Sequence, residues 1–156
     1  MKTTVLAAVL GAWLSGTLFM WAVATQNFRV AERFAAGRPQ PEEARLLMRY
    51  QASEVNRLFF DRWGWAQLAL GAVFTWLAWG SRPLRVTALA MLAILVVLHF
   101  YVVPETVRLG RLLDFVPRDP APPAATPFWR LHHAYTALDM LKFLLGVFGL
   151  GRLPRG

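Results

Sequence analysis

The sequence predicts an all-α fold, a membrane-spanning antiparallel four-helix bundle, and three observations support it. First, 56% of the 156 residues are hydrophobic, whereas soluble domains are about 45–50% apolar. Second, the apolar residues collect in four blocks, each close to the ~20 residues that a helix needs to cross the hydrocarbon core. Third, polar or proline-containing stretches separate the blocks, so that successive helices reverse direction. The expected spans are residues 4–25, 58–79, 86–107 and 127–150, within one integral membrane domain, 1–156.

The first block resembles a secretory signal peptide, because Lys2 precedes an apolar run and Ala22-Val23-Ala24 resembles a cleavage site. However, the run is longer than the roughly 7–15 apolar residues of a signal peptide. We therefore expect residues 4–25 to remain as the first span.

The first two helices are expected to extend past the membrane. No helix breaker occurs in residues 26–36, and the next breaks are Gly37 and Pro41. Glu42 and Glu43 then provide acidic side chains in the first turn of the second helix, where they suit the helix dipole. The sequence therefore predicts a long hairpin of helices 1 and 2 that protrudes from the bilayer.

The other connections differ in character. Residues 80–85 predict a tight polar turn, and the proline-rich residues 110–126 predict an irregular surface loop. Pro104 lacks a backbone N–H and should interrupt the hydrogen-bond ladder of the third helix. Glu54 and Arg57 are spaced to form an i,i+3 ion pair on a solvated face of the hairpin.

Small residues predict close helix packing. Gly64, Gly71 and Ala78 lie close together on one face of the second span, and Gly11 with Ser15 forms a small-xxx-small pair on the first. Between chains, the same pattern would allow helix dimerisation.

The formal net charge is +8, from 17 Lys and Arg against 9 Asp and Glu. These bases flank the spans, where they meet anionic head groups, so we expect no nucleic-acid partner. Most arginines lie on the side of the hairpin, which the positive-inside rule places in the cytoplasm with both termini outside. The expected location is a bacterial inner (cytoplasmic) membrane. The absence of cysteine excludes disulfides and cysteine-ligated metals.

The last span carries a polar stripe. His132, Tyr135, Asp139 and Lys142 fall within roughly 80° of one another on a helix. Ionisable groups in a span are costly unless they face the protein interior and find partners. We therefore expect the stripe to face inward, with Asp139 and Lys142 as a buried polar pair at i,i+3. A proton relay along the stripe is the alternative interpretation.

Two histidines are expected at similar depth on neighbouring helices, His99 on the third and His132 on the fourth. They could ligate haem b axially or share a metal ion, or each could hydrogen-bond within the bundle. His99, His132, Tyr135, Gln67 and Glu105 could also line a small pocket for a quinone or a lipid head group.

Glu105 is expected to pair with an arginine of the hairpin, such as Arg62. Tryptophans at the ends of the spans predict an aromatic belt at the two membrane interfaces.

Three segments resemble the transmembrane-protein-205-like family. They are Phe128-Trp129-Arg130-Leu131-His132-His133-Ala134-Tyr135-Thr136-Ala137-Leu138, Tyr101-Val102-Val103-Pro104 with Arg108, and Gly16-Thr17-Leu18-Phe19 with Phe28. These are small four-helix membrane proteins whose common domain has no assigned function. The resemblance implies the same fold and makes His132 the family histidine. Asp139 departs from the amide-type residue expected at its position.

The sequence contains no phosphate-binding loop, metalloprotease motif, serine elbow or acidic metal cluster. We therefore expect a non-enzymatic accessory or scaffolding subunit of a larger membrane complex, with the bilayer and other membrane subunits as partners. One alternative is a haem- or quinone-binding electron-transfer subunit that uses His99 and His132. The other is a small proton-coupled carrier built on the polar stripe.

Overall fold

The computed structural model describes residues 2–37, 41–117 and 119–153, and this part of the chain is all-helical, without strands. The helices are α1 (Lys2–Ala36), α2 (Glu42–Ala78), α3 (Arg82–Val97), η1 (Leu98–Val102), α4 (Val103–Arg111) and α5 (Ala125–Gly151). Because α3, η1 and α4 follow one another without a break, the described part of the chain forms four long helical rods, as predicted. The expected break between Gly37 and Pro41 falls on residues 38–40, outside the described residues.

Three helices are long and apolar enough to cross a membrane: Thr3–Ala36, Arg82–Arg111 and Ala125–Gly151. They indicate an integral membrane protein. The predicted second span, 58–79, lies in α2, which is not among them. That segment is diluted by Gln67 and by several glycine and tryptophan residues, which lower its mean hydropathy.

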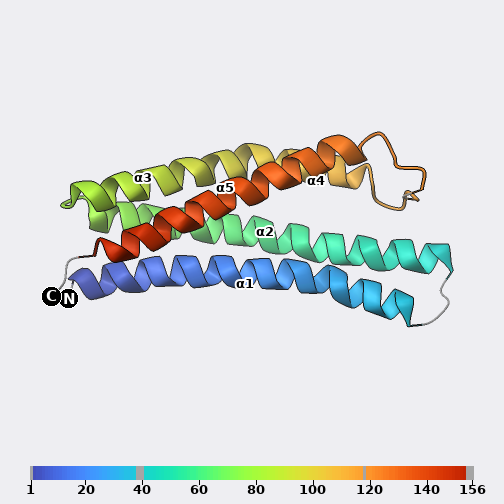
Figure 1. The fold of residues 1–156 in the computed structure, drawn as a ribbon, viewed down its shortest axis with the longest axis horizontal. Coiled ribbons are helices and arrows are strands. Elements are labelled where there is room, and N and C mark those ends of the chain that lie inside the picture. The colour runs from blue at the N-terminus through green and yellow to red at the C-terminus, as the bar shows by residue number, and fades with distance from the viewer. Residues whose placement is uncertain (1, 38–40, 118, 154–156) are drawn as a thin grey trace.

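Figure 1 shows the helices packed side by side, with the start of α1 and the end of α5 at the same end of the molecule. α1 contacts α2 and α5, and α3 contacts α2 and α5. Toward its N-terminal end, α5 diverges from α1 and follows α4 (Figure 1).

The apolar core lies between α1, α2 and α3, where Leu10, Trp13, Phe74, Leu84 and Met91 have almost no exposed surface. Burial of such side chains contributes about 1.5–3 kcal/mol each relative to exposure in water. For the membrane-embedded part, close packing replaces this solvent effect as the source of helix association.

Glycines allow the closest helix contacts. A Cβ atom built on Gly16 would lie 2.1 Å from the Trp63 ring, and one on Gly146 would lie 2.6 Å from Leu14. By contrast, a Cβ on Gly11 would meet nothing within 4 Å. The expectation that Gly11 and Ser15 pack helices within the chain is therefore wrong. Ser15 is exposed, and its hydroxyl donates to the Gly11 carbonyl of its own helix.

The third rod contains a π-helical turn, η1, just before Pro104. Proline cannot donate to the preceding turn, so the ladder is interrupted there, as predicted. The chain accommodates the interruption with one wider turn instead of ending the helix. In this turn Leu98, His99 and Val102 are buried.

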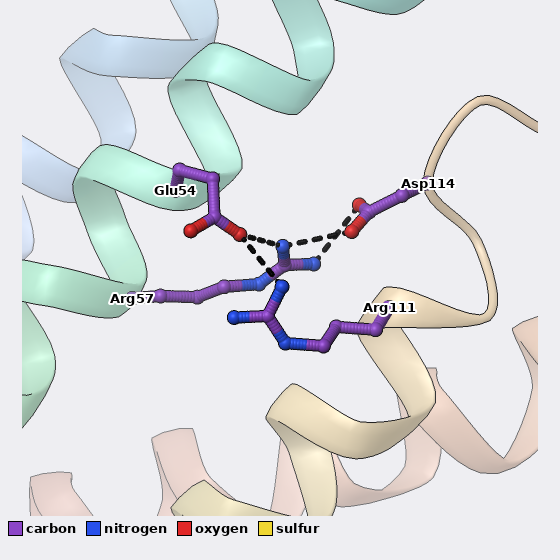
Figure 2. Close-up of polar contacts among 4 residues, drawn as sticks. All are labelled: Glu54, Arg57, Arg111 and Asp114. Atoms are coloured by element: carbon purple, nitrogen blue, oxygen red, sulfur yellow. Dashed lines mark hydrogen bonds and ion pairs between the residues drawn. The ribbon is translucent and has the colours of Figure 1, made fainter.

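A group of four charged side chains, here named the arginine cluster, joins α2 to the residues at and after the end of α4. Figure 2 shows its four side chains, Glu54, Arg57, Arg111 and Asp114, converging from these two segments. Arg57 donates two hydrogen bonds to Asp114, at 2.8 and 2.9 Å, and one to Glu54, at 2.5 Å. Arg111 donates to the same Glu54 oxygen at 3.1 Å. The hydrogen bond from Arg57 is the main reason that the pKa of the Glu54 carboxyl lies below its usual value of 4.5.

Candidate functional site: a buried polar network

Asp139 and Lys142 form an ion pair inside the protein. The Lys142 Nζ and Asp139 Oδ1 atoms are 2.5 Å apart, and the residues are only 1% and 2% exposed, respectively. Together with Gly146 and Gly149 they form the buried face of α5. Because the pair lies one helical turn apart on a single helix, local geometry alone brings the two groups together.

Three further side chains complete the site. Lys142 also donates to Gln67 Oε1, and Trp13 Nε1 donates to the same oxygen at 2.9 Å. Trp21 Nε1 donates to Asp139 Oδ2 at 2.7 Å. Trp13, Trp21, Gln67, Asp139 and Lys142 are hereafter the buried polar network. It connects α1, α2 and α5 by charge-assisted hydrogen bonds.

The network is electrically neutral, and each of its charges has a hydrogen-bonded partner inside the protein. Both carboxylate oxygens of Asp139 accept a hydrogen bond, and the ammonium group of Lys142 donates two. A buried ion pair with good geometry is tolerated because each charge compensates the other, whereas loss of one partner leaves an uncompensated charge. The arrangement therefore fixes the relative positions of three helices.

Trp13 and Trp21 were missed in the sequence analysis, which treated tryptophan as an interfacial residue. Trp13 is fully buried, and the buried Thr17 lies between the two indoles along α1. The available signal was their spacing of eight residues, which places two indole N–H donors on one face of a span.

His99 lies next to the network but makes no bond to it. The side chain is 8% exposed and packs so close to α2 that a Cβ atom on Gly64 would be 2.2 Å from its Nδ1. Among the described residues, Nδ1 has no hydrogen-bond partner. The Trp65 ring meets His99 edge-on, with ring centroids 4.8 Å apart.

His99, Gln67 and Tyr135 together line a small cavity with a volume of about 10 Å³. Apolar side chains of Phe60, Leu95, Leu98 and Val103, with Gly64, form the rest of its wall. This volume corresponds to about one water molecule. The structure thus brings these three predicted site residues together, in a space much smaller than an organic ligand.

His132 does not face inward, so this part of the predicted stripe is wrong. It is exposed, and its ring lies near Trp129 and stacks with Phe128, at centroid distances of 5.4 and 6.1 Å. On a helix it shares a face with Asp139. However, α5 diverges from α1 toward its N-terminal end and follows α4 instead (Figure 1), and His132 is exposed there.

Glu105 does not contribute to the cavity and does not pair with Arg62. Its carboxylate binds Arg108 on the same helix, with distances of 2.6 and 2.7 Å. An i,i+3 partner on the same exposed face is always within reach, whereas an arginine on α2 would require the right rotation of both helices.

Haem b and quinone do not fit the arrangement. His99 is buried against Gly64, whereas His132 lies on the outer surface. The cavity beside His99 has room for a water molecule but not for a porphyrin or a quinone ring. Within residues 2–37, 41–117 and 119–153, no group of three or more His, Asp or Glu side chains is placed to hold a metal ion.

Comparison of the chain with protein-family models, curated proteins and solved structures found no match in any of the three. The function must therefore be argued from the contacts, burial and charges of the chain itself.

Proposed function

We propose that this protein is a non-enzymatic accessory or scaffolding subunit of a larger membrane complex, built as a single antiparallel four-helix bundle that spans a bacterial inner membrane. The observation that carries the proposal is the buried and electrically neutral polar network. Each of its charges has a partner, and the adjacent cavity of about 10 Å³ leaves no room for a substrate. Such a site holds helices in position.

The path of the chain supports four crossings. α1, the α3–α4 rod and α5 are long and apolar enough to span a membrane. α2 returns the chain from the far end of α1 to the start of α3 (Figure 1), so it lies beside the others across the same thickness. Gln67, near the middle of the expected span 58–79, is 2% exposed, and its side-chain oxygen accepts hydrogen bonds from Trp13 and Lys142.

The lengths of α1 and α2 support a protruding hairpin. They contain 35 and 37 residues, or about 50 Å at 1.5 Å per residue, against about 30 Å of hydrocarbon. The distribution of arginines favours a cytoplasmic hairpin with both termini outside.

The protruding part of the hairpin carries a candidate surface for partner subunits. Val30, Phe34 and Leu47 are 59%, 63% and 57% exposed, and they lie beyond the expected membrane boundary. Lipid tails would not cover these side chains there. Val30 and Phe34 lie one helical turn apart and share a face of α1. A subunit that docks on this hairpin would cover such exposed apolar side chains.

Purification in mild detergent tests the proposal. We expect co-purifying membrane proteins with the native chain and their loss with the double variant Val30→Ala/Phe34→Ala. A matched control removes the same residue types from the lipid-facing side of α5, Val147→Ala/Phe148→Ala, which are similarly exposed at 46% and 51%. A native protein that always purifies alone, or equal loss with both double variants, would contradict the proposal.

A proton-coupled carrier is a second candidate, because an ionisable pair lies within a span. The double variant Asp139→Asn/Lys142→Met removes both charges and separates the two functions. In vesicles with an enclosed pH-sensitive dye, a carrier would lose proton flux with this variant while remaining folded. A scaffold would show no flux before or after the substitution.

We also propose membership of the transmembrane-protein-205-like family, on the residues quoted above for the first, third and last helices. The exposed position of His132, beside Phe128 and Trp129, suits a role at the surface of α5. A profile built from that family's sequences and aligned with this chain tests the membership. Alignment of the Leu131-His132 pair with the family pair would support it, and a different register would contradict it.

A further inference from the structure

We propose that the cavity between α2, η1 and α5 binds one ordered water molecule, and that this water joins His99 to the buried polar network. The inference is independent of the accessory-subunit function. It rests on an unpaired buried nitrogen, the orientation of a buried amide, and the size and lining of the cavity.

The first observation is His99. Its ring is 92% buried, and Nδ1 has no protein hydrogen-bond partner among the described residues, although it is fully enclosed. An unpaired buried polar atom destabilises the folded state, because it has lost its hydrogen bonds to water without replacement. Buried waters are found where they satisfy such groups. His99 borders the cavity, and so does Gly64, the residue that its Nδ1 atom approaches.

The second observation is the orientation of Gln67. Its two partners, the Trp13 indole and the Lys142 ammonium group, are both donors, so the oxygen of the amide must face them. The NH₂ group then points away from these partners. Because Gln67 also lines the cavity, its NH₂ group is the donor that it can present to a water molecule.

The third observation is the cavity itself. Its volume of about 10 Å³ suits a single water molecule, and Tyr135 supplies a third polar side chain to the lining. A buried water typically makes about three hydrogen bonds. It can accept one from Gln67, form one with the His99 imidazole, and donate to or accept from the Tyr135 hydroxyl.

The π-helical turn explains why the site occurs here. The widened turn of η1 carries His99 at the position where Gly64 lets α2 come closest. π-turns are frequent at functional positions in helices. With the water in place, one hydrogen-bonded path runs from Trp21 through Asp139, Lys142 and Gln67 to His99.

Solution NMR of the full chain in lipid nanodiscs, with ¹⁵N-labelled histidine, tests the inference. We expect a water-edited cross-peak between the buried His99 ring and a bound water molecule. This water molecule should exchange only slowly with bulk water. The variant Val103→Leu enlarges an apolar side chain of the cavity wall without removing a polar group. We expect this variant to lose the cross-peak while the helix content of the protein is unchanged. Val97→Leu, on the exposed face of the same rod, is the matched control.

A second measurement keeps the inference testable if a variant folds poorly. The losses in melting temperature caused by His99→Leu and Tyr135→Phe should not add, because either change removes a partner of the same water. Losses for the exposed pair His133→Leu and Tyr101→Phe should add. A dry cavity in a high-resolution map, a direct bond from His99 to Gln67, or additive losses at His99 and Tyr135 would overturn the inference.

Discussion

The buried polar network and the arginine cluster use the same chemistry in two different environments. Asp139 and Lys142 are almost completely enclosed, and indole and amide groups complete their hydrogen bonding. In the arginine cluster, the side chains of Arg57 and Asp114 are each 13% exposed, Glu54 is 36% exposed and Arg111 is 56% exposed. When one charge of the arginine cluster is removed, water and dissolved ions can therefore compensate for part of the interactions that its partners lose.

The comparison shows that the value of an ion pair depends on what surrounds it. In the enclosed network, protein groups satisfy both charges, so removal of one charge cannot be compensated by solvent. In the partly exposed cluster, the same loss is softened by hydration and screening. The following predictions test this contrast, from the largest expected effect to the smallest.

Removal of one charge from the network should have the largest effect. We expect Asp139→Ala to lower the free energy of unfolding by about 3–5 kcal/mol, because Lys142 would remain buried without its counter-ion. The double variant Asp139→Leu/Lys142→Met should recover most of this loss. Equilibrium unfolding in mixed detergent micelles measures both values, and Met140→Ala, which is exposed to lipid, is the control. A loss below about 1 kcal/mol for Asp139→Ala would contradict this expectation, because it would mean that the pair stabilises the fold no more than an exposed ion pair does.

Arg57→Met should have an intermediate effect. It removes two hydrogen bonds to Asp114 and one to Glu54, and we expect a loss of about 1.5–3 kcal/mol, typical of a hydrogen bond to a charged group. Arg57→Lys should recover only part of it, because an ammonium group cannot reproduce the bidentate geometry. The same unfolding assay applies, with the exposed Arg108→Met as a variant that should change little. Equal effects of Arg57→Met and Arg108→Met would show that the cluster adds no more than an ordinary surface pair.

Gly64→Ala should disturb the contact that holds His99 beside the network. Its new Cβ would come within 2.2 Å of the His99 ring, and overpacking of this kind costs about 1–3 kcal/mol. Gly11→Ala is the matched substitution at a helix position without neighbours, and it should stabilise α1 by about 0.5–1 kcal/mol. Thermal unfolding of both variants separates the effects. The packing argument fails if the two variants melt alike.

The smallest effect should be the pH dependence of the arginine cluster. The pKa of Glu54 is lowered in the folded protein, mainly by its hydrogen bond from Arg57. The ionised Glu54 carboxylate therefore contributes its full stabilisation above pH 4.5, the usual pKa of this group. The contribution is lost as the pH falls through the lower pKa that Glu54 has in the folded protein. We expect native protein and Glu54→Gln to differ in melting temperature at neutral pH, and the difference to close on acidification. A difference that persists below the folded pKa would mean that Glu54 acts through packing.

The sequence predicts local structure much better than contacts between helices. The four helical rods, the extension of α1 to Ala36 and the interruption before Pro104 follow from apolar blocks and from helix-breaking residues. The i,i+3 ion pairs of Asp139 with Lys142 and of Glu54 with Arg57 also appear in the structure. Each depends only on the geometry of one helix.

Partners on different helices could not be predicted in the same way. The bond from Trp13 to Gln67 requires a particular rotation of α1 and α2 about their axes, and the bonds from Arg57 to Asp114 require a particular path of the loop. Neither is encoded in the spacing of one segment. The expectation for His132 is wrong for the same reason, because its angular position on α5 follows from spacing, whereas its exposure depends on how α5 packs against the other helices.

The charges of α5 also have a consequence for the biogenesis of the protein. α5 has the lowest mean hydropathy of the three apolar helices, 1.3 against 1.7 and 2.5, and on the translocon scale a central Asp or Lys disfavours insertion by about 2.5–3.5 kcal/mol. The ribosome synthesises this segment after Trp13, Trp21 and Gln67, so the side chains that complete the hydrogen bonding of the ion pair are already present when α5 emerges. We therefore expect insertion of α5 to depend on the earlier helices, so that α5 alone should insert less efficiently than α5 in the full chain.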